Sequence, residues 1–116
     1  MPILAGTNGA LKMAAYRFTR TVAFKTIAAM MESMPTCIKI VDYISKTWKV
    51  EAHLMAPTLG GHPARVVFVT MVDDINALQA SQAESMKDKK YLTLINALHP
   101  HIDGSATNDQ VYKIIV

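Results

Sequence analysis

The chain has 116 residues, of which 51% are hydrophobic and 18% are charged, so it can form one folded domain with a core and does not have a disordered composition. Its net charge of +3 is mild, and no basic run is longer than Lys89-Lys90, which gives little support to nucleic-acid binding. No apolar stretch is long enough to cross a membrane and the N-terminus shows no secretory signal, so we expect a cytoplasmic protein.

The first part of the chain predicts a strand followed by a long helix. Residues 10–18, ALKMAAYRF, alternate loosely, which is typical of a strand, and Thr19 or Thr21 then offers a helix cap. Apolar residues recur from there in steps of three and four, which predicts one helix face over residues 21–47. This face consists of Phe24, Ile27, Met31, Met34, Ile38, Val41 and Trp48, widened by Met30, Cys37, Ile40 and Ile44.

Pro35 falls inside this helical pattern. A proline removes one backbone hydrogen bond and disfavours helical geometry at Met34, so two separate helices are an alternative. The apolar phase continues unbroken past Pro35, and we therefore favour one helix with a kink there. Cys37 lies in the same apolar segment and, as the only cysteine, cannot form an internal disulfide, so we expect a buried structural thiol.

Two strands joined by a turn are predicted next. Residues 50–56, VEAHLMA, alternate between apolar residues on one face and Glu51, His53 and Met55 on the other. Residues 65–72, RVVFVTMV, are apolar on both faces. The intervening Gly60-Gly61-His62-Pro63 could be a ligand-cradling loop or a hairpin turn. Phosphate-binding loops lead into a helix, whereas this one leads into a strand, so we favour the turn.

A second helix and a last strand complete the predicted fold. Asp73 or Asp74 is expected to cap the helix. A charged cluster at residues 87–90 interrupts the helix, and His99-Pro100 ends it. Residues 110–116, QVYKIIV, are expected to form a strand. The order β-α-β-β-α-β predicts a single α+β, ferredoxin-like domain over residues 1–116, with a four-stranded antiparallel sheet.

This predicted sheet is apolar on both faces. Two helices can cover only one face, yet the runs VVFV at 66–69 and KIIV at 113–116 place apolar residues on both. An uncovered face of this kind exceeds the apolar patch that a monomer usually tolerates. We therefore expect a homodimer in which two sheets pack face to face, the alternative being a monomer with some exposed hydrophobic residues.

Four motifs run from Gly60 to the C-terminus: GGHPARVVFV, DDINAL, KKYLTLINALHPHI and DQVYKIIV. Together they resemble the second half of NIPSNAP-type domains, within the dimeric α/β-barrel superfamily, while the first half of the chain shares only the order of elements. The resemblance implies a dimeric α/β barrel. It leaves the activity open, because the superfamily includes cofactor-independent monooxygenases, haem-degrading enzymes, isomerases and proteins without an established activity.

The haem-degrading members of that superfamily combine an asparagine, a tryptophan and a histidine in fixed places. Trp48 and His53 cannot be matched to that arrangement together with Asn76 or Asn96, which weakens a haem-related function. We expect no cofactor.

His53 is the candidate catalytic residue. If the apolar face of its strand meets the helices, its imidazole points into the space between the two sheets of a dimer, beside Glu51 and Met55. An imidazole that titrates near neutral pH suits general-base work on a phenol or an activated C–H group. The alternative is a half-exposed histidine on an edge strand.

Three further residues are candidates for binding a ligand. Tyr16 could orient a ligand through its hydroxyl group, and Trp48 could close a pocket at the end of the long helix, although each could equally be a large core side chain. Met55 shares the strand face of His53.

His99 and His101 would lie on one side of an extended segment, where a metal could use them. Only Asp103 joins them, and Pro100 and Gly104 mark the stretch as a turn that ends a helix. We therefore expect no metal site.

Two functions remain open. The first is a homodimer that binds a small apolar or aromatic molecule between its sheets and acts on it as a cofactor-independent monooxygenase or isomerase. The second is a non-catalytic interaction or structural homodimer. A cavity of a few hundred Å³ lined by His53 and aromatic residues would favour the first, and a filled inter-sheet space would favour the second.

Overall fold

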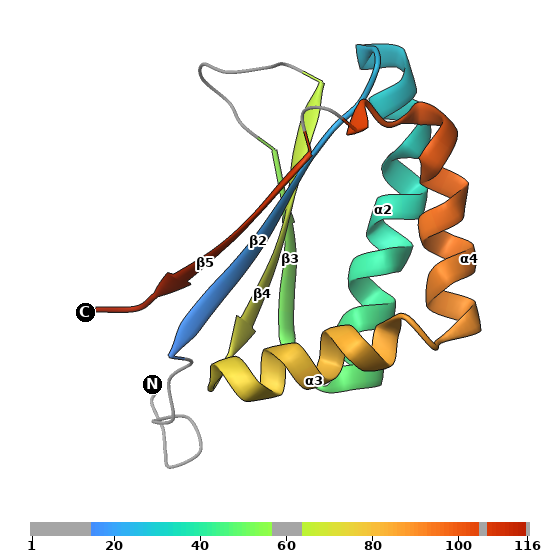
Figure 1. Cartoon of the computed structure of the whole chain (residues 1–116). Helices are drawn as coiled ribbons and strands as arrows, with labels where there is room; N and C mark the ends of the chain where they lie inside the picture. Colours follow the sequence, from blue (N-terminus) through green and yellow to red (C-terminus); the bar gives the residue numbers. More distant parts are fainter. Residues whose placement is uncertain (1–14, 57–63, 105–106, 116) are drawn as a thin grey trace, which may run out of the picture.

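The computed structural model describes residues 15–56, 64–104 and 107–115. Its elements are β2 (Tyr16–Ala23), α2 (Ile27–Trp48), β3 (Glu51–Met55), β4 (Arg65–Val72), α3 (Ile75–Ser85), α4 (Lys89–Leu98), the 3₁₀ turn η1 (His99–His101) and β5 (Asn108–Lys113). The strands form one antiparallel sheet in the order β3-β4-β2-β5, and the helices lie on one side of it (Figure 1). The predicted ferredoxin-like α+β fold is confirmed. None of the helices among the described residues combines the length and the hydrophobicity that a membrane span needs.

The first strand ends later than the sequence suggested. Every residue from Tyr16 to Ala23 pairs with β4, so Thr19 and Thr21 lie inside the strand and do not cap a helix. Thr26 is the cap instead, and its hydroxyl oxygen accepts a hydrogen bond of 3.0 Å from the backbone N–H of Ala29. Residues 10–14 of the predicted strand lie outside the described residues.

α2 is a single helix that contains Pro35, as predicted, but it begins at Ile27 rather than near residue 21, because the strand before it is longer than expected. The kink at Pro35 remains a prediction. Lys49 ends α2 in a left-handed conformation, with φ of 54°, and so turns the chain toward β3.

The buried face of α2 is only partly the expected one, since Met34 and Val41 of the predicted stripe pack against the core. Ser33, Cys37 and Ile40 are its buried residues, and they belong to the positions that only widened the predicted stripe or, for Ser33, lay outside it. The stripe positions Ile27, Met31 and Ile38 are 51%, 67% and 58% exposed. The helix carries apolar residues around much of its circumference, so contacts with the sheet and α4 decide which of them are buried.

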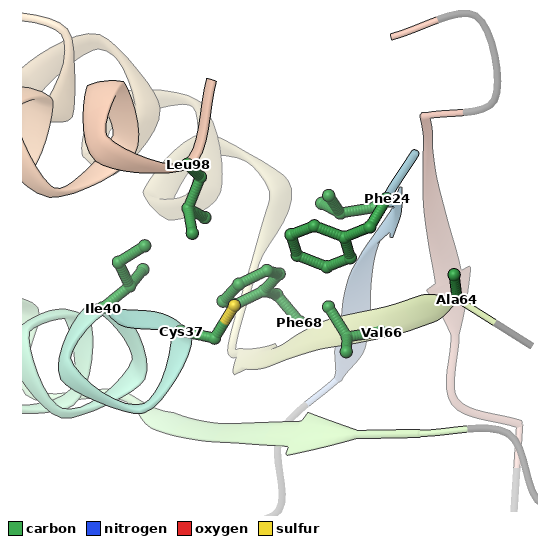
Figure 2. Close-up of a cluster of buried hydrophobic side chains, with 8 residues drawn as sticks. Phe24, Cys37, Ile40, Ala64, Val66, Phe68 and Leu98 are labelled. Atoms are coloured by element: carbon green, nitrogen blue, oxygen red, sulfur yellow. The ribbon is translucent and has the colours of Figure 1, made fainter. Parts of the chain in front are cut away.

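The core joins the helix layer to one face of the sheet. Its fully buried side chains include Phe24 beyond β2, Val66 on β4, Cys37 and Ile40 on α2, and Leu98 on α4 (Figure 2). Burial raises the pKa of the Cys37 thiol to about 11, so the group is protonated at neutral pH, and the expectation of a buried cysteine is confirmed.

The strand register assigns side chains to the two faces of the sheet. Leu54, Phe68, Arg20 and Asp109 form one cross-strand row, and Phe68 and Leu54 contact the core, so this row faces the helices. The neighbouring row points away from the helices and consists of His53, Val69, Thr19 and Gln110. We call the face to which this second row belongs the open face.

The open face is apolar mainly along β4, which provides Val67, Val69 and Met71. The expectation that β4 is apolar on both faces is therefore confirmed. The last strand differs, because β5 ends at Lys113 and its residues are all exposed. Ile114 follows the strand, its N–H donates a hydrogen bond of 2.9 Å to the carbonyl of Ala15, and it is half-buried, whereas Ile115 is 81% exposed, so only one isoleucine of the run KIIV continues the pairing with β2.

Two aspartates explain why the second helical segment is divided. Asp74 accepts a hydrogen bond of 2.7 Å from the N–H of Ala77 and caps α3, whereas Asp88 accepts one of 2.9 Å from the N–H of Tyr91 and begins α4. β3 and β4 pair antiparallel, as a hairpin requires, and the turn predicted at residues 60–63 lies outside the described ranges.

The position of the buried face of α2 is testable with a matched pair of isoleucines. We expect Ile40→Ala to lower the free energy of unfolding by about 2–4 kcal/mol, because it leaves a cavity in the core. Ile38→Ala, at an exposed position of the same helix, should cost only about 0.5 kcal/mol. Denaturant unfolding measures both values, and equal losses would show that the helix face is assigned wrongly.

Candidate functional site

A cleft of about 500 Å³ lies between the helix layer and the sheet. β2 contributes Phe18 and Arg20 to its lining, α2 contributes Trp48, and α4 contributes Tyr91. Leu78 and other residues of α3 line it as well, and in Figure 1 α3 runs across the end of the layer where α2 ends and α4 begins. The volume and the mainly apolar lining are typical of a site for a small molecule.

The aromatic wall of the cleft is held in place by several contacts. The ring of Trp48 makes edge-to-face contacts with Tyr43 and Tyr91, at centroid distances of 5.9 and 5.7 Å. Its indole N–H donates a hydrogen bond of 2.6 Å to the carboxylate of Glu84 on α3. The hydroxyl of Tyr43 donates one of 2.7 Å to Asp88, the cap of α4. Trp48 therefore joins α2 to both following helices.

The Asp88 carboxylate has two structural roles at this end of the molecule. Hydrogen bonds from the backbone N–H of Tyr91 and from the Tyr43 hydroxyl hold its pKa below the usual range. The same hydrogen bond to Asp88 is the main cause that raises the pKa of Tyr43. At neutral pH Asp88 is therefore an ionised carboxylate and Tyr43 a neutral phenol, which are the two forms that make this hydrogen bond.

Arg20 supplies the charge in the cleft. Its Nε and Nη2 donate hydrogen bonds of 2.8 and 2.9 Å to the two carboxylate oxygens of Asp109 on β5. These bonds raise the pKa of Arg20, against the opposing effect of burial. The guanidinium carbon lies 5.6 Å from the centre of the Phe18 ring. Burial raises the pKa of the neighbouring Tyr91, and the charge of Arg20 partly offsets that shift.

The four residues predicted from the sequence do not form one site. Trp48 lines the cleft. Tyr16 lies on the helix-facing side of β2, opposite Val72, and is not part of the lining. His53 and Met55 share the open face, on the other side of the sheet from the cleft.

His53 lies at an exposed position on the edge strand. Its Nε2 is 2.7 Å from a carboxylate oxygen of Glu51, and its side chain is 54% exposed. Met55 is 52% exposed on the same face. The open face therefore carries the imidazole and a carboxylate together, as the alternation in residues 50–56 predicted.

The sequence reading missed Phe18 and Arg20 as a pair. Tyr16, Phe18, Arg20 and Val22 alternate with period two, which places them on one strand face. Because the strand was expected to end at residue 18, Arg20 was placed outside it. A strand predicted to continue to Val22 would have placed Phe18 and Arg20 next to each other on the face toward the core.

His99 and His101 lie in the 3₁₀ turn η1 rather than on an extended segment. Among the described residues, no three potential metal ligands of the His, Cys, Asp or Glu type come together. The expectation of no metal at this turn remains a prediction.

The sequence matches no protein-family model, and no curated protein matches it significantly. Solved structures, in contrast, match over most of the chain. An uncharacterised NIPSNAP domain protein from Burkholderia xenovorans has a TM-score of 0.73 at 14% identity, covering 87% of this chain and 95% of its own. A dimeric ferredoxin-like protein from an uncultured marine organism has a TM-score of 0.70 at 13% identity, covering 89% and 97%.

The third similar structure is that of the cofactor-independent oxygenase SnoaB from Streptomyces nogalater, with a TM-score of 0.65 at 10% identity and coverage of 89% and 95%. At these identities the likeness concerns the fold. The resemblance to NIPSNAP-type domains is thus confirmed at the level of the fold, and the chain has the ferredoxin-like architecture that these proteins share.

Proposed function

We propose that the protein is a homodimer that binds a small, mainly apolar or aromatic molecule, and that the binding site is the cleft between sheet and helices. The observation that supports this most directly is the cleft itself, with about 500 Å³ of space and the rings of Phe18, Trp48 and Tyr91 in its lining. A planar ligand can pack against such rings with little loss of conformational entropy, because the contacts of Trp48 already fix the wall.

Cofactor-independent oxygenation is the reaction that we propose to test first. A structure of similar fold is described as a cofactor-independent oxygenase, and the cleft combines an apolar lining with one cation that can stabilise a substrate anion. The alternative is a non-catalytic interaction or structural homodimer. Oxygen uptake in the presence of a bound ligand distinguishes the two.

The open face supports the proposed dimer. Val67 and Met71 are half-buried on it and Met55 is 52% exposed, whereas Val69 and Thr19 at its centre are already buried within the single chain. Helices cover only the other side of the sheet. Packing two such faces together would bury roughly 600–1,000 Å² per subunit, which is the size of a stable interface. His53 and Glu51 would then lie between the sheets, which keeps His53 a candidate for chemistry at that second location.

The location of the ligand is testable with two substitutions on α3. Ser81 lines the cleft and Ala83, two residues on, is exposed. We expect Ser81→Phe to fill the cleft and to weaken binding of the neutral fluorophore N-phenyl-1-naphthylamine by about tenfold or more. Ala83→Phe should leave the affinity within about twofold.

His53→Ala extends this test to the other side of the sheet. If the cleft is the site, fluorescence titration of this variant should give an affinity within about twofold of the wild type. Loss of binding in His53→Ala but not in Ser81→Phe would place the ligand between the sheets and would contradict the proposal.

The dimer is testable with two valines on opposite faces. Val67 lies on the open face, whereas Val111 pairs with Phe18 on the helix-facing side of β5 and is 45% exposed. Val67→Asp should place an unpaired charge in the interface and yield monomer or aggregate. Val111→Asp should remain a dimer. Sedimentation at micromolar concentration measures both, and a monomeric wild type would refute the assembly.

A further inference from the structure

We infer that the ligand of the cleft carries an anionic group, that Arg20 holds this group, and that Asp109 competes with the ligand for the same guanidinium. This inference rests on the proposed function, because it assigns a chemical class to the molecule that occupies the cleft. The expected ligand is a planar aromatic or conjugated carboxylate or sulfonate. Neutral hydrocarbons of the same shape should bind less tightly.

The first argument is the distribution of charge. Arg20 is the only charged side chain among the described residues that line the cleft, and the others are apolar or neutral, such as Thr70, Gln82 and Asn96. A cation among aromatic rings attracts an anion more strongly than one in bulk water does, because the apolar walls screen the charge less. The rings would hold the body of the ligand while Arg20 fixes its charged end.

The second argument is the geometry of the Arg20–Asp109 pair. Asp109 uses Nε and Nη2 of the guanidinium, and a hydrogen bond with Tyr91 of the cleft lining adds to the raised pKa of Arg20, so a ligand anion would meet Arg20 beside the Tyr91 hydroxyl. The carboxylate comes from β5, the outermost strand on this side, and does not itself line the cleft. Arg20 therefore presents part of its guanidinium to the cleft, while Asp109, which lies outside the cleft, neutralises the positive charge.

The third argument is that the pair is open to exchange. The side chains of Arg20 and Asp109 are 39% and 46% exposed, so water screens their attraction, although the two parallel hydrogen bonds make the pair stronger than a surface pair with a single contact. A ligand anion that reaches Arg20 from the apolar side can share the guanidinium or replace Asp109. In both cases the negative charge of Asp109 opposes binding, so its removal should strengthen it.

Two fluorophores with the same ring system provide the test. 8-Anilinonaphthalene-1-sulfonate carries an anion, and N-phenyl-1-naphthylamine lacks it. Arg20→Gln should raise the dissociation constant of the anionic probe by about tenfold, since a charge-assisted hydrogen bond is lost. The same change should leave the neutral probe within about twofold. Asp109→Asn should lower the dissociation constant of the anionic probe by about threefold, in line with the small energies of exposed ion pairs.

Controls separate charge recognition from general effects on the fold. Arg17→Gln changes an arginine of the same strand on the open face, where it lies 5.2 Å from the Tyr112 ring, and should alter neither affinity. Arg20→Gln combined with Asp109→Asn should behave like Arg20→Gln alone, because Asp109 acts through Arg20. Ser81→Phe should weaken both probes, which shows that they bind in the cleft rather than on the open face.

The outcomes distinguish this inference from the proposed function. If the neutral probe binds in the cleft but Arg20→Gln weakens both probes equally, Arg20 contributes only packing and the inference is wrong while the binding function stands. If Asp109→Asn does not increase the affinity for the anionic probe, Asp109 does not compete with the ligand for Arg20, and that part of the inference is wrong. If neither probe binds the wild type, the binding function and the inference fall together.

Discussion

The structure depends on the packing of α2 and α4 against one face of the sheet. At one end of this layer Phe24, Cys37, Ile40, Val66 and Leu98 form a dense core. At the other end the same two helices are joined by the contacts of Trp48, and α3 lies across the gap. The cleft lies at the end where Trp48 and Tyr91 line the helix layer, whereas the other end is filled by the side chains of the core. Binding space and stability are thus provided by different parts of one interface.

The sequence was sufficient for the order of elements, for the continuity of α2 through Pro35 and for the two apolar faces of β4. It failed at boundaries and at the orientation of α2. Threonine is as suitable in a strand as at a helix cap, so the run TRT at 19–21 could not be assigned by type alone. α2 has apolar residues at too many positions for periodicity to identify the buried ones, and Ile38 and Ile40 have opposite environments.

The candidate site was less accessible than the fold. Trp48 could be predicted as a lining residue, because a large aromatic side chain at the end of a helix is usually at least partly buried. Its partners Glu84 and Tyr91 could not be predicted, because they are distant in the sequence. The contact between Arg20 and Asp109 joins residues 89 positions apart and follows from the pairing of β2 with β5, which no local pattern reveals. His53 was placed on the correct strand face, yet that face lies on the other side of the sheet from the cleft.

The alternation of β2 has a consequence for how such a protein can change over time. Phe18 and Arg20 face the cleft, whereas Arg17, Thr19 and Thr21 face the open side. Substitutions at even-numbered positions of this strand can therefore change the lining of the cleft without touching the surface proposed for assembly, and those at odd positions can do the reverse. A strand divided in this way lets the lining of an inner cleft and the outer surface of the sheet vary separately within one architecture.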